Sequence, residues 1–588
     1  MRWTSKPLQD DQVSALSQSL GSSRILATLL IRLGISDPDA AQAFLHPRLR
    51  QLDDPFSITN LRSAVDRIRQ AIDGGEKMVV LGDYDVDGVT STALLISILR
   101  RLGAKQPGFI VPRRLEEGYG LSRIAIDRVL EEEDIDLFIA VDCGTNSVEE
   151  VAYLRAKGID AIIIDHHRSK EEIPEDAILI NPHVLDRPDQ PWVNLCTVGL
   201  VFKVAHGLLK VLRAEKNPAA YQIVLKDYLD LVAMGTIADL VPLRDENRIL
   251  CKYGLRVIQE GRRPGVNALL KVSGVKQGEE VVPMDISFRI GPRINASGRL
   301  ADASLPVEML LNDNPAFCEE SAQLLEEFNR ERQEIERQIT IEAKRQREIH
   351  VPDAMGVVLF NEEWHAGVVG IVASRISRKY HRPTIVLASE DGVAQGSGRS
   401  VSGINLVEIL RECDDLLESW GGHPLAVGVS LPQENVADFQ IRFDELVREA
   451  SKNIPLEPEI EVAAWLELSD VNEDLLADLD LLHPFGQGHR EPIFAVKDVV
   501  LQTPVEVFME RHFRFRIVDQ NRRRLFGVAW QKADRIPPIG EPIDVLIRVY
   551  WNYFNNRKSL QLEMIDWRPS GPSRELPPPM AMESLVNK

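Results

Sequence analysis

LGDYDVDGVTS, residues 81–91, carries three aspartates at alternate positions, Asp83, Asp85 and Asp87. Carboxylates this close together repel one another, so something positive should bind among them. The residues just before, KMVVLG, form a short apolar run that is typical of a buried strand. Residues 89–103 are apolar at helical spacing and end near a glycine. The stretch therefore predicts a strand, an acidic loop and a helix.

The spacing D-x-D-x-D-G also opens the calcium loop of an EF-hand, which needs a bidentate glutamate at its twelfth position. Counted from Asp83, the twelfth residue is Leu94. An EF-hand also needs a helix before the loop, where this chain has the apolar, β-branched run. Both observations argue against an EF-hand.

Two further apolar runs end in polar residues. DLFIAVDCG reaches Asp142, and DAIIIDHH ends in Asp165, His166 and His167. Helical segments between the runs imply a parallel sheet, whose ligands bind beyond the carboxyl ends of the strands. A buried helical segment, YLDLVAMGTIADLVPL, brings a further acid near its end, Asp239. Three strands that deliver acids to one edge indicate a single site.

The residue types at this edge predict a metal site. Carboxylates with one or two imidazoles suit Mn²⁺ or Mg²⁺ better than zinc. The carboxylates outnumber what one cation needs, so two cations sharing a bridging aspartate are expected. Such a pair clamps a phosphate and activates a water molecule, which predicts hydrolysis of a phosphate ester. Taken singly, an aspartate after a strand is often only a helix cap, and a histidine pair is more often structural.

Composition bounds the class of protein. A chain of 588 residues predicts three or four domains. No apolar run approaches the roughly 18 residues of a membrane span, and the first residues lack the apolar core of a signal peptide. Without such a run, no membrane contact is expected. The five cysteines are scattered without a C-x-x-C pair, which predicts a cytoplasmic protein with no structural zinc.

The net charge of −20 argues by itself against a nucleic-acid-binding protein. Bound cations would offset part of that charge at the acidic site. Charge is also segregated along the chain, because residues 510–532 hold seven arginines and lysines against two acids. A basic surface is therefore possible within an acidic total.

The pattern along the chain predicts a multidomain α/β protein. We expect a long helix to join two αβ domains, with Leu324, Phe328, Ile335 and Ile339 on its apolar face and its alternating charges merely solvated. Short strands with turns after residue 456 predict a β-barrel of the OB type. The expected boundaries are a helical lead-in at 1–50, a catalytic αβ domain at 51–310, the connecting helix at 311–350, the second αβ domain at 351–455, the barrel at 456–568 and a disordered tail at 569–588.

In order and spacing, GDYDVDG, VDCG, DHH and GTIAD resemble the motifs of the DHH phosphoesterase superfamily. VPRRLEEGYG, PRINASGR, WHAGVVGIVASR, GSGRS, GGHPLAVG and HPFGQGHREPIF are similar to motifs of the RecJ family of bacterial single-strand-specific exonucleases, and the match covers about residues 50–568. The resemblance implies DHH and DHHA1 domains joined by the long helix and followed by an OB-fold. It implies degradation of single-stranded DNA from its 5′ end to 5′-mononucleotides, with two Mn²⁺ or Mg²⁺ ions, in DNA recombination and repair.

The resemblance also implies roles for individual residues. Asp142 would bridge the two cations, His167 would contact the scissile phosphate, and Asp165 would orient a neighbouring group, so that these three and His166 form the catalytic set. The implied metal ligands are Asp83, Asp85, Asp87, Asp142, His166 and Asp239.

Basic and polar residues elsewhere would hold DNA, because the fork of an arginine pairs well with phosphate oxygens. The resemblance places Ser397, Arg399 and Arg114 at the terminal phosphate. Arg293, Asn295 and Arg299 would line the path near the scissile bond, and His365 and His423 would complete the site from the second αβ domain.

The barrel would widen the grip on a single strand. Phe513, Phe515, Trp530 and Tyr550 could stack on bases or fill the barrel core. Alternation in FRFRI puts phenylalanine on one face and arginine on the other, so the arginine face is the better candidate for DNA. By family resemblance, single-strand binding protein and helicases are expected partners.

Three alternatives remain at this point. Smaller DHH relatives cleave short oligonucleotides, cyclic dinucleotides or pyrophosphate, but they lack an added barrel. A non-catalytic scaffold would gain nothing from three crowded aspartates. An acidic multidomain protein without a nucleic-acid role would leave GSGRS, GGHPLAVG and the basic run at 510–532 unexplained.

Overall fold

The structure is a computed structural model, and it describes residues 2–112, 120–132, 134–169, 172–276, 278–300, 303–519, 522–554 and 557–571. The chain falls into two compact units, each built from separate segments of sequence. The first comprises Met1–Leu52, Leu240–Lys252 and Glu459–Lys588, and the second comprises Asp53–Asp239 and Tyr253–Pro458.

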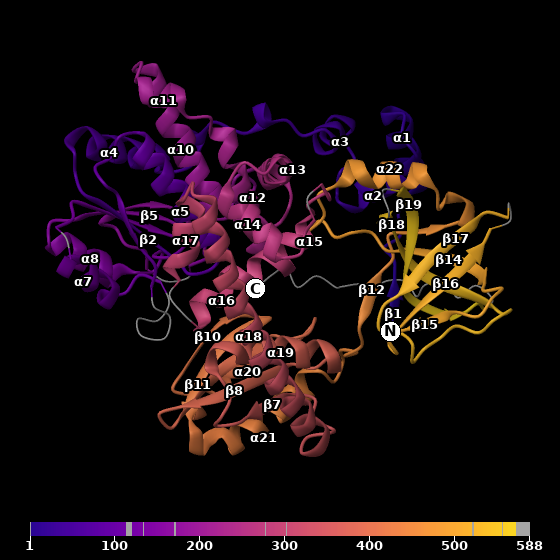
Figure 1. Ribbon diagram of the computed structural model, residues 1–588. Coiled ribbons are helices and arrows are strands. Elements are labelled where there is room, and N and C mark those ends of the chain that lie inside the picture. The colour runs from indigo at the N-terminus through magenta and orange to yellow at the C-terminus, as the bar shows by residue number, and fades with distance from the viewer. Residues whose placement is uncertain are drawn as a thin grey trace. The chain divides into compact units, whose positions relative to one another are not determined.

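The second unit contains a five-stranded parallel sheet in the order β3-β2-β4-β5-β6. Two of its strands, β2 and β5, are labelled in Figure 1. Two of its three interior strands, β2 and β4, are buried along their whole length, as expected for a sheet covered on both faces. The sheet confirms the α/β class. Its strands are β2 (Met78–Gly82), β3 (Gly108–Ile110), β4 (Leu137–Val141), β5 (Asp160–Ile164) and β6 (Ala177–Ile180).

Helix α5 (Val86–Arg101) follows β2 through the acidic loop, as the sequence predicts. It is buried along almost its whole length and packs against α10 and α12. The other helices of the second unit are α4 (Leu61–Gly74), α7 (Arg123–Glu132), α8 (Val148–Ala156), α9 (Pro182–Leu185), α10 (Thr197–Ala214), α11 (Pro218–Gln222), α12 (Leu229–Ala238), α14 (Pro264–Val272), α15 (Pro283–Asp285), α16 (Gly291–Leu300) and α17 (Ser304–Leu311). Helix α13 (Asp245–Glu260) belongs to the first unit up to Lys252 and to the second from Tyr253.

The long helix α18 spans Pro315–Ile349, within the predicted connecting segment. The predicted apolar stripe is wrong in part, because Leu324 is 40% exposed. The buried face instead carries polar side chains, and Arg332 donates hydrogen bonds to Glu336 (2.7 Å) and Asn329 (2.7 Å). Some charges of this helix are therefore part of its packing and not merely solvated.

A second sheet in this unit has five strands in the order β10-β11-β9-β8-β7. Only β7 and β8 run parallel, and the other neighbours are antiparallel. Helix α19 packs against β8 and β9. The elements are β7 (Val357–Phe360), α19 (Ala366–Tyr380), β8 (Thr384–Glu390), β9 (Val393–Arg399), α20 (Leu406–Arg411), β10 (Ser419–His423), β11 (Ala426–Pro432) and α21 (Val436–Ala450).

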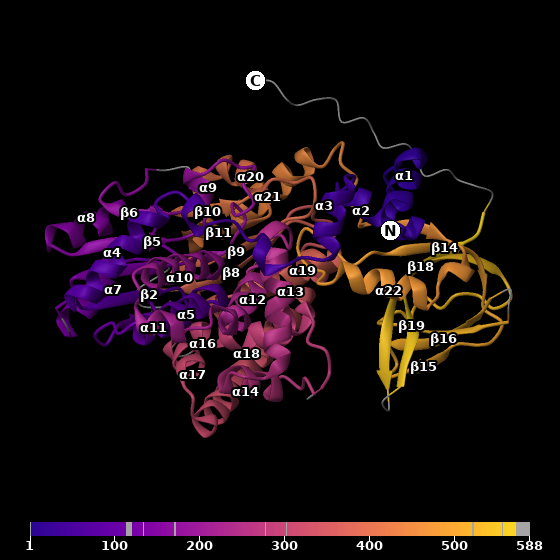
Figure 2. The same ribbon diagram turned by 90° about the horizontal axis from the view of Figure 1, so that it is seen from above.

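The first unit holds a seven-stranded sheet in the order β13-β14-β18-β19-β17-β16-β15. The long antiparallel pair β18–β19 is its most prominent feature (Figure 2). A bridge between Leu501 and Ile517 joins the end of β14 to β16, so the sheet closes on itself as a barrel does. The elements are β13 (Ala464–Leu466), α22 (Glu473–Leu482), β14 (Phe494–Val500), β15 (Glu506–Phe508), β16 (His512–Val518), β17 (Arg524–Ala529), β18 (Pro542–Phe554) and β19 (Arg557–Pro569).

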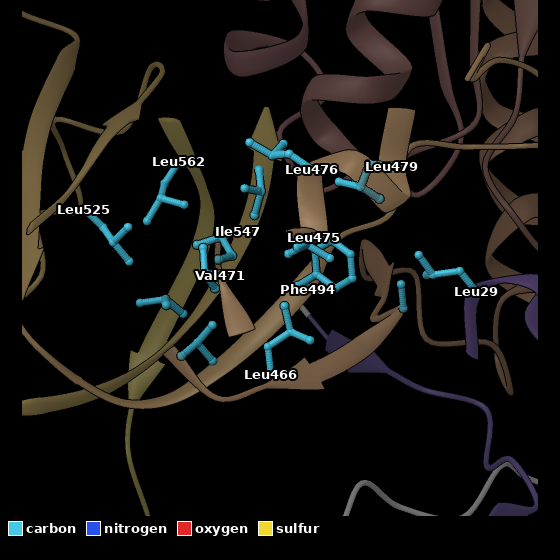
Figure 3. Packing of buried hydrophobic residues seen from close by; sticks show 14 of the residues in the cluster. Leu29, Leu466, Val471, Leu475, Leu476, Leu479, Phe494, Leu525, Ile547 and Leu562 are labelled. Atoms are coloured by element: carbon cyan, nitrogen blue, oxygen red, sulfur yellow. The ribbon is translucent and has the colours of Figure 1, made fainter. Parts of the chain in front are cut away.

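The N-terminal helices belong to this same unit. Helices α1 (Asp10–Leu20), α2 (Arg24–Arg32) and α3 (Pro38–Leu45) share one hydrophobic core with α22 and the barrel strands. Figure 3 shows part of this core, with Leu29 of α2 beside residues of α22 and the barrel. Strand β1 (Arg2–Thr4) pairs in parallel with β12 (Glu459–Glu461). The segment that the sequence predicts as a lead-in is thus part of the C-terminal core.

Within the residues that the structure describes, no helix combines the length and apolarity needed to cross a membrane. All five cysteines are buried and free.

Candidate metal centre

The register of the parallel sheet places the acidic residues side by side at the carboxyl edge of the strands. Gly82 of β2 pairs with Val141 of β4, which in turn pairs with Ile164 of β5. The next residue of each strand is an aspartate. Because β3 lies on one side of β2 and β4 on the other, the strand order reverses between β2 and β4, where ligands of such sheets bind.

The side chains form one continuous cluster. The potential ligand atoms form three groups, and within each group they lie within 4.8 Å of one another. Asp142 belongs to two of the groups and His166 to two, so the groups are connected. The Nε2 atom of His166 lies 3.6 Å from Asp142 Oδ1 and 3.5 Å from Asp239 Oδ2. All six predicted metal ligands meet here, and the groups are Asp142, His166 and His167; Asp87, His166 and Asp239; and Asp83, Asp85 and Asp142.

Tight packing around the acidic loop requires glycine at two positions. A Cβ atom on Gly88 would lie 2.3 Å from the carbonyl oxygen of Asp83. A Cβ atom on Gly235 of α12 would lie 2.8 Å from Oδ1 of Asp87. Asp85 caps α5 by accepting hydrogen bonds from the amides of Asp87 (2.8 Å) and Gly88 (3.1 Å) through one carboxylate oxygen. Its other oxygen is not used by the cap.

Burial and mutual repulsion perturb the acids. Burial, and then the neighbouring carboxylates, raise the pKa of Asp87 to about 7 and that of Asp239 to about 8. The same causes raise the pKa of Asp142 well above its usual value. Burial lowers the pKa of His166 to about 4, so its imidazole is neutral at physiological pH and can serve as a ligand.

This arrangement fits divalent cations. Nε2 of His166 and Oδ2 of Asp239 are buried, and neither forms a hydrogen bond with any residue that the structure describes. Buried polar atoms in proteins are normally satisfied, so this pair of unsatisfied acceptors indicates a ligand. Oxygen donors with one imidazole suit Mn²⁺ or Mg²⁺.

Asp165 is held by hydrogen bonds, and it belongs to none of the three ligand groups found among the described residues. Its Oδ1 lies 2.7 Å from Nδ1 of His167, and its Oδ2 accepts hydrogen bonds from the amide and hydroxyl of Thr145. Burial opposes the charge of His167, but the bond to Asp165 and its charge raise the pKa of His167 to about 9. Asn181, which the sequence did not single out, donates hydrogen bonds to Thr145 Oγ1 (2.9 Å) and to the carbonyl of His167 (2.8 Å).

The three predicted DNA-binding residues of α16 differ in their partners within the protein. Arg293 is only 12% exposed and pairs with Glu326 of α18 at 2.6 Å, so it ties two helices together. The side-chain oxygen of Asn295 is buried, and none of the described residues hydrogen-bonds to it. Arg299 donates to the carbonyl of Gly367 in α19. Arg114 lies outside the described residues.

The remaining predicted phosphate ligands gather around the first turns of α19. His365 is its N-cap residue and accepts a hydrogen bond from the amide of Gly367. A Cβ atom on Gly370 would lie 3.1 Å from Ser397 Oγ and 3.7 Å from Arg399 Nη2. Burial lowers the pKa of Arg399, and no described carboxylate forms an ion pair with it. Across the sheet, His423 is in register with Ala426, which is in register with Arg399.

The acidic cluster predicts how Mn²⁺ will stabilise the protein at different pH values. The folded-state pKa values of Asp87 and Asp239 lie above the unfolded value of about 3.9, so the metal-free fold is penalised as pH rises from about 4 to about 8. A bound cation removes that penalty and requires deprotonated ligands. We expect the rise in melting temperature on adding Mn²⁺ to be larger at pH 8.5 than at pH 6. Differential scanning calorimetry would measure it, and an equal rise at both pH values would contradict the assignment.

Comparison with known proteins agrees with this geometry. Residues 77–236 match the DHH family N-terminal domain, residues 353–449 the DHHA1 domain and residues 462–566 the RecJ OB domain. The single-stranded-DNA-specific exonuclease RecJ of Bacillus subtilis is 35% identical over 96% of this chain and 70% of its own length. The Escherichia coli protein of that name is 35% identical over 86% of this chain and 89% of its own length.

Solved structures show the same architecture. The crystal structure of RecJ from Thermus thermophilus in complex with Mn²⁺ matches with a TM-score of 0.80 and 28% identity, over 97% of this chain and 80% of that one. A crystal structure of exonuclease RecJ bound to manganese is 32% identical, with a TM-score of 0.59, over 70% of this chain and 99% of that one. A complex of the Thermus thermophilus protein with Mg²⁺ also matches. The chain therefore belongs to the RecJ family.

Proposed function

We propose that this protein is a single-stranded-DNA-specific exonuclease that hydrolyses phosphodiester bonds from the 5′ end, releases 5′-mononucleotides and acts in DNA recombination and repair. The observation that carries the proposal is the continuous cluster in which Asp142 and His166 join three groups of ligands at the edge of the parallel sheet. Membership in the RecJ family supports single-stranded DNA as the substrate.

The residues of the cluster have distinct tasks. When bound, two Mn²⁺ or Mg²⁺ ions would polarise the phosphodiester and lower the pKa of the attacking water. Asp142 shares one ligand group with Asp83 and Asp85, and its Oδ1 lies 3.6 Å from Nε2 of His166, which suits it to be the bridging ligand. The raised pKa of His167 keeps its imidazole protonated near neutral pH, so it can donate a hydrogen bond to the scissile phosphate. Asp165 holds Nδ1 of that ring and thereby fixes the orientation of Nε2.

The 5′ phosphate would bind at the start of α19, where Ser397 and Arg399 lie against Gly370. We expect Arg399→Ala to raise KM about 10- to 100-fold for 5′-phosphorylated strands, since hydrogen bonds to charged groups contribute about 1.5–3 kcal/mol. Strands with a 5′ hydroxyl should be affected much less. Steady-state kinetics on both substrates would measure the difference, with Arg378→Ala, an exposed arginine in the last turn of α19, as the control.

The barrel would hold the strand through its outer face. Phe513 and Phe515 are buried, so they fill the core, while Arg514 is exposed and Arg516 is half-buried on the opposite face. Phe526, 58% exposed, lies in register with Arg516 and supplies an aromatic surface beside it. Alternating cations and aromatic rings suit a single strand.

Further aromatic residues extend this surface. Trp530 is exposed, and its ring packs edge-to-face with the rings of Phe508 and His512. The distances between ring centroids are 5.8 Å and 5.1 Å. Tyr550 lies on β18, half-buried. We therefore propose Trp530, and not the two core phenylalanines, as the stacking residue among the predicted four.

The decisive assay uses DNA labelled at the 3′ end, with Mn²⁺, as a single strand and as a blunt duplex. A ladder that shortens from the 5′ end on the single strand alone is the expected result. Cleavage of both substrates, or shortening from the 3′ end, would contradict the proposal. Cleavage restricted to the shortest oligonucleotides would favour the activity of the smaller DHH relatives instead.

We extend the proposal to a cytoplasmic location, which the five free cysteines support. Single-strand binding protein and helicases would be partners that supply or present the single strand. Addition of each purified partner to the assay tests this, and an unchanged rate of degradation would count against it.

A further inference from the structure

The N-terminus of α10 contacts two of the candidate metal ligands, although nothing in the sequence NLCTVGLVFKV points to chemistry. The amide of Thr197 donates to Oδ2 of Asp87 (2.7 Å), and the hydroxyl of the same residue donates to Oδ1 of Asp142 (3.0 Å). We infer that Thr197 is a positioning residue that sets the placement of Asp87 relative to Asp142. This inference rests on the proposed metal-dependent function.

The backbone of α10 fixes the carboxylate of Asp87. The amide of Val198 donates to Oδ1 (2.9 Å) while the amide of Thr197 donates to Oδ2, so both oxygens are held and the carboxylate plane cannot rotate. The N-terminus of this 18-residue helix also favours negative charge. Each carboxylate oxygen has a further lone pair, which leaves it able to coordinate a cation.

The hydroxyl of Thr197 adds the second connection. Asp142 follows β4 with a backbone φ of 67°, in the left-handed region, and its amide donates to the carbonyl of Ile164 (3.0 Å). Oδ1 of Asp142, which accepts from the threonine hydroxyl, is also the atom that lies 3.6 Å from Nε2 of His166. One residue therefore joins the loop after β2 to the loop after β4.

The local structure explains why threonine suits this position. Thr197 is fully buried at the first position of α10, and its β-branched side chain has restricted rotation, so the hydroxyl stays directed at Asp142. The preceding residue, Cys196, has its sulfur 3.3 Å from Oγ1 of Thr236 in α12, the helix that leads to Asp239. The start of α10 is thus held against the element that supplies a third ligand.

Binding of Mn²⁺ to the metal-free protein tests the inference independently of activity. Thr197→Val replaces the hydroxyl with a methyl group of similar size, and we expect it to weaken Mn²⁺ binding about 10- to 100-fold, as is typical when a partner of a metal ligand is removed. Thr197→Ser keeps the hydroxyl and should restore affinity to within about threefold of wild type. Thr197→Ala removes the hydroxyl together with the γ-methyl group and should weaken Mn²⁺ binding at least as much as the valine variant does.

The matched control is Thr340→Val, which makes the same exchange at a buried threonine of α18. It should leave the dissociation constant for Mn²⁺, measured by electron paramagnetic resonance of the free ion, unchanged. Valine and alanine variants that bind Mn²⁺ as tightly as wild type would overturn the inference while leaving the proposed nuclease intact. A wild-type protein that binds no Mn²⁺ and cleaves no DNA would instead overturn the proposed function.

Discussion

Asp142→Ala is expected to lower kcat/KM on 5′-phosphorylated single-stranded DNA by more than about a thousandfold. Removing a single oxyanion-hole donor from an enzyme already costs about 10²–10³ in rate, and loss of the proposed bridging ligand removes more of the charge that stabilises the transition state. As the proposed bridge, Asp142 lies with Asp83 and Asp85 on one side and 3.6 Å from Nε2 of His166 on the other, so the change affects both proposed cation positions. Single-turnover degradation of a labelled strand in Mn²⁺ would measure the loss.

The same variant should fold normally, which separates a catalytic loss from a structural one. Asp142 is buried among other carboxylates that raise its pKa, so its removal relieves repulsion in the metal-free protein. This relief offsets the lost bond to Thr197 and the cost of alanine at a φ of 67°, so the melting temperature of Asp142→Ala in a chelator at pH 8 should stay within a few degrees of that of wild type. Asp160→Ala, at the first position of β5, is the control and should remain active. Activity of Asp142→Ala within tenfold of wild type would contradict the assignment.

Phe494→Ala should destabilise the first unit by about 3–5 kcal/mol, the usual cost of truncating a fully buried phenylalanine. Phe494 is fully buried in the core that the barrel strands share with α1, α2 and α3 (Figure 3). Urea unfolding followed by tryptophan fluorescence would measure the change. Phe526→Ala removes an exposed ring from the same sheet and should change stability by no more than about 0.5 kcal/mol.

Because the core is shared, Phe494→Ala should also affect the N-terminal helices. If the N-terminal helices depend on the barrel, Phe494→Ala should speed amide hydrogen exchange in α2 as well as in β14 and β18. Unchanged protection of α2 in a variant whose strands exchange faster would show that the two segments are stable separately.

Local sequence signals predicted the catalytic sheet well. The run before Asp83 forms β2, and the segment after it forms α5, because burial on both faces and helical periodicity leave clear local patterns. The convergence of the acidic residues followed from a general property of parallel sheets. The order and spacing of the acidic motifs were sufficient to indicate the family.

Contacts between distant segments could not be predicted in this way. The indole nitrogen of Trp3 donates to Asp566, 563 residues away, and no local pattern records such a pair. The N-terminal helices pack into the barrel core through contacts between segments that are far apart in the sequence, so local patterns could not predict that packing either. Along α18, periodicity of apolar residues misplaced Leu324 because the buried face is partly polar and includes Arg332.

Polar side chains were the hardest to assign. Arg293 has the chemistry of a phosphate ligand, but in the structure Glu326 is its partner. Thr197 carries no motif, and its role depends on the packing of α10 against the acidic loop. An arginine or a threonine is compatible with many partners, and only the fold selects among them.

The number of Mn²⁺ ions bound per chain tests the metal centre most directly. Titration of the metal-free protein, followed by electron paramagnetic resonance, should find two ions whose spins are coupled through a shared ligand. Asp142→Ala should lose the coupling and at least one ion. A single uncoupled ion in wild type, or two coupled ions retained in Asp142→Ala, would contradict a two-cation centre bridged by Asp142.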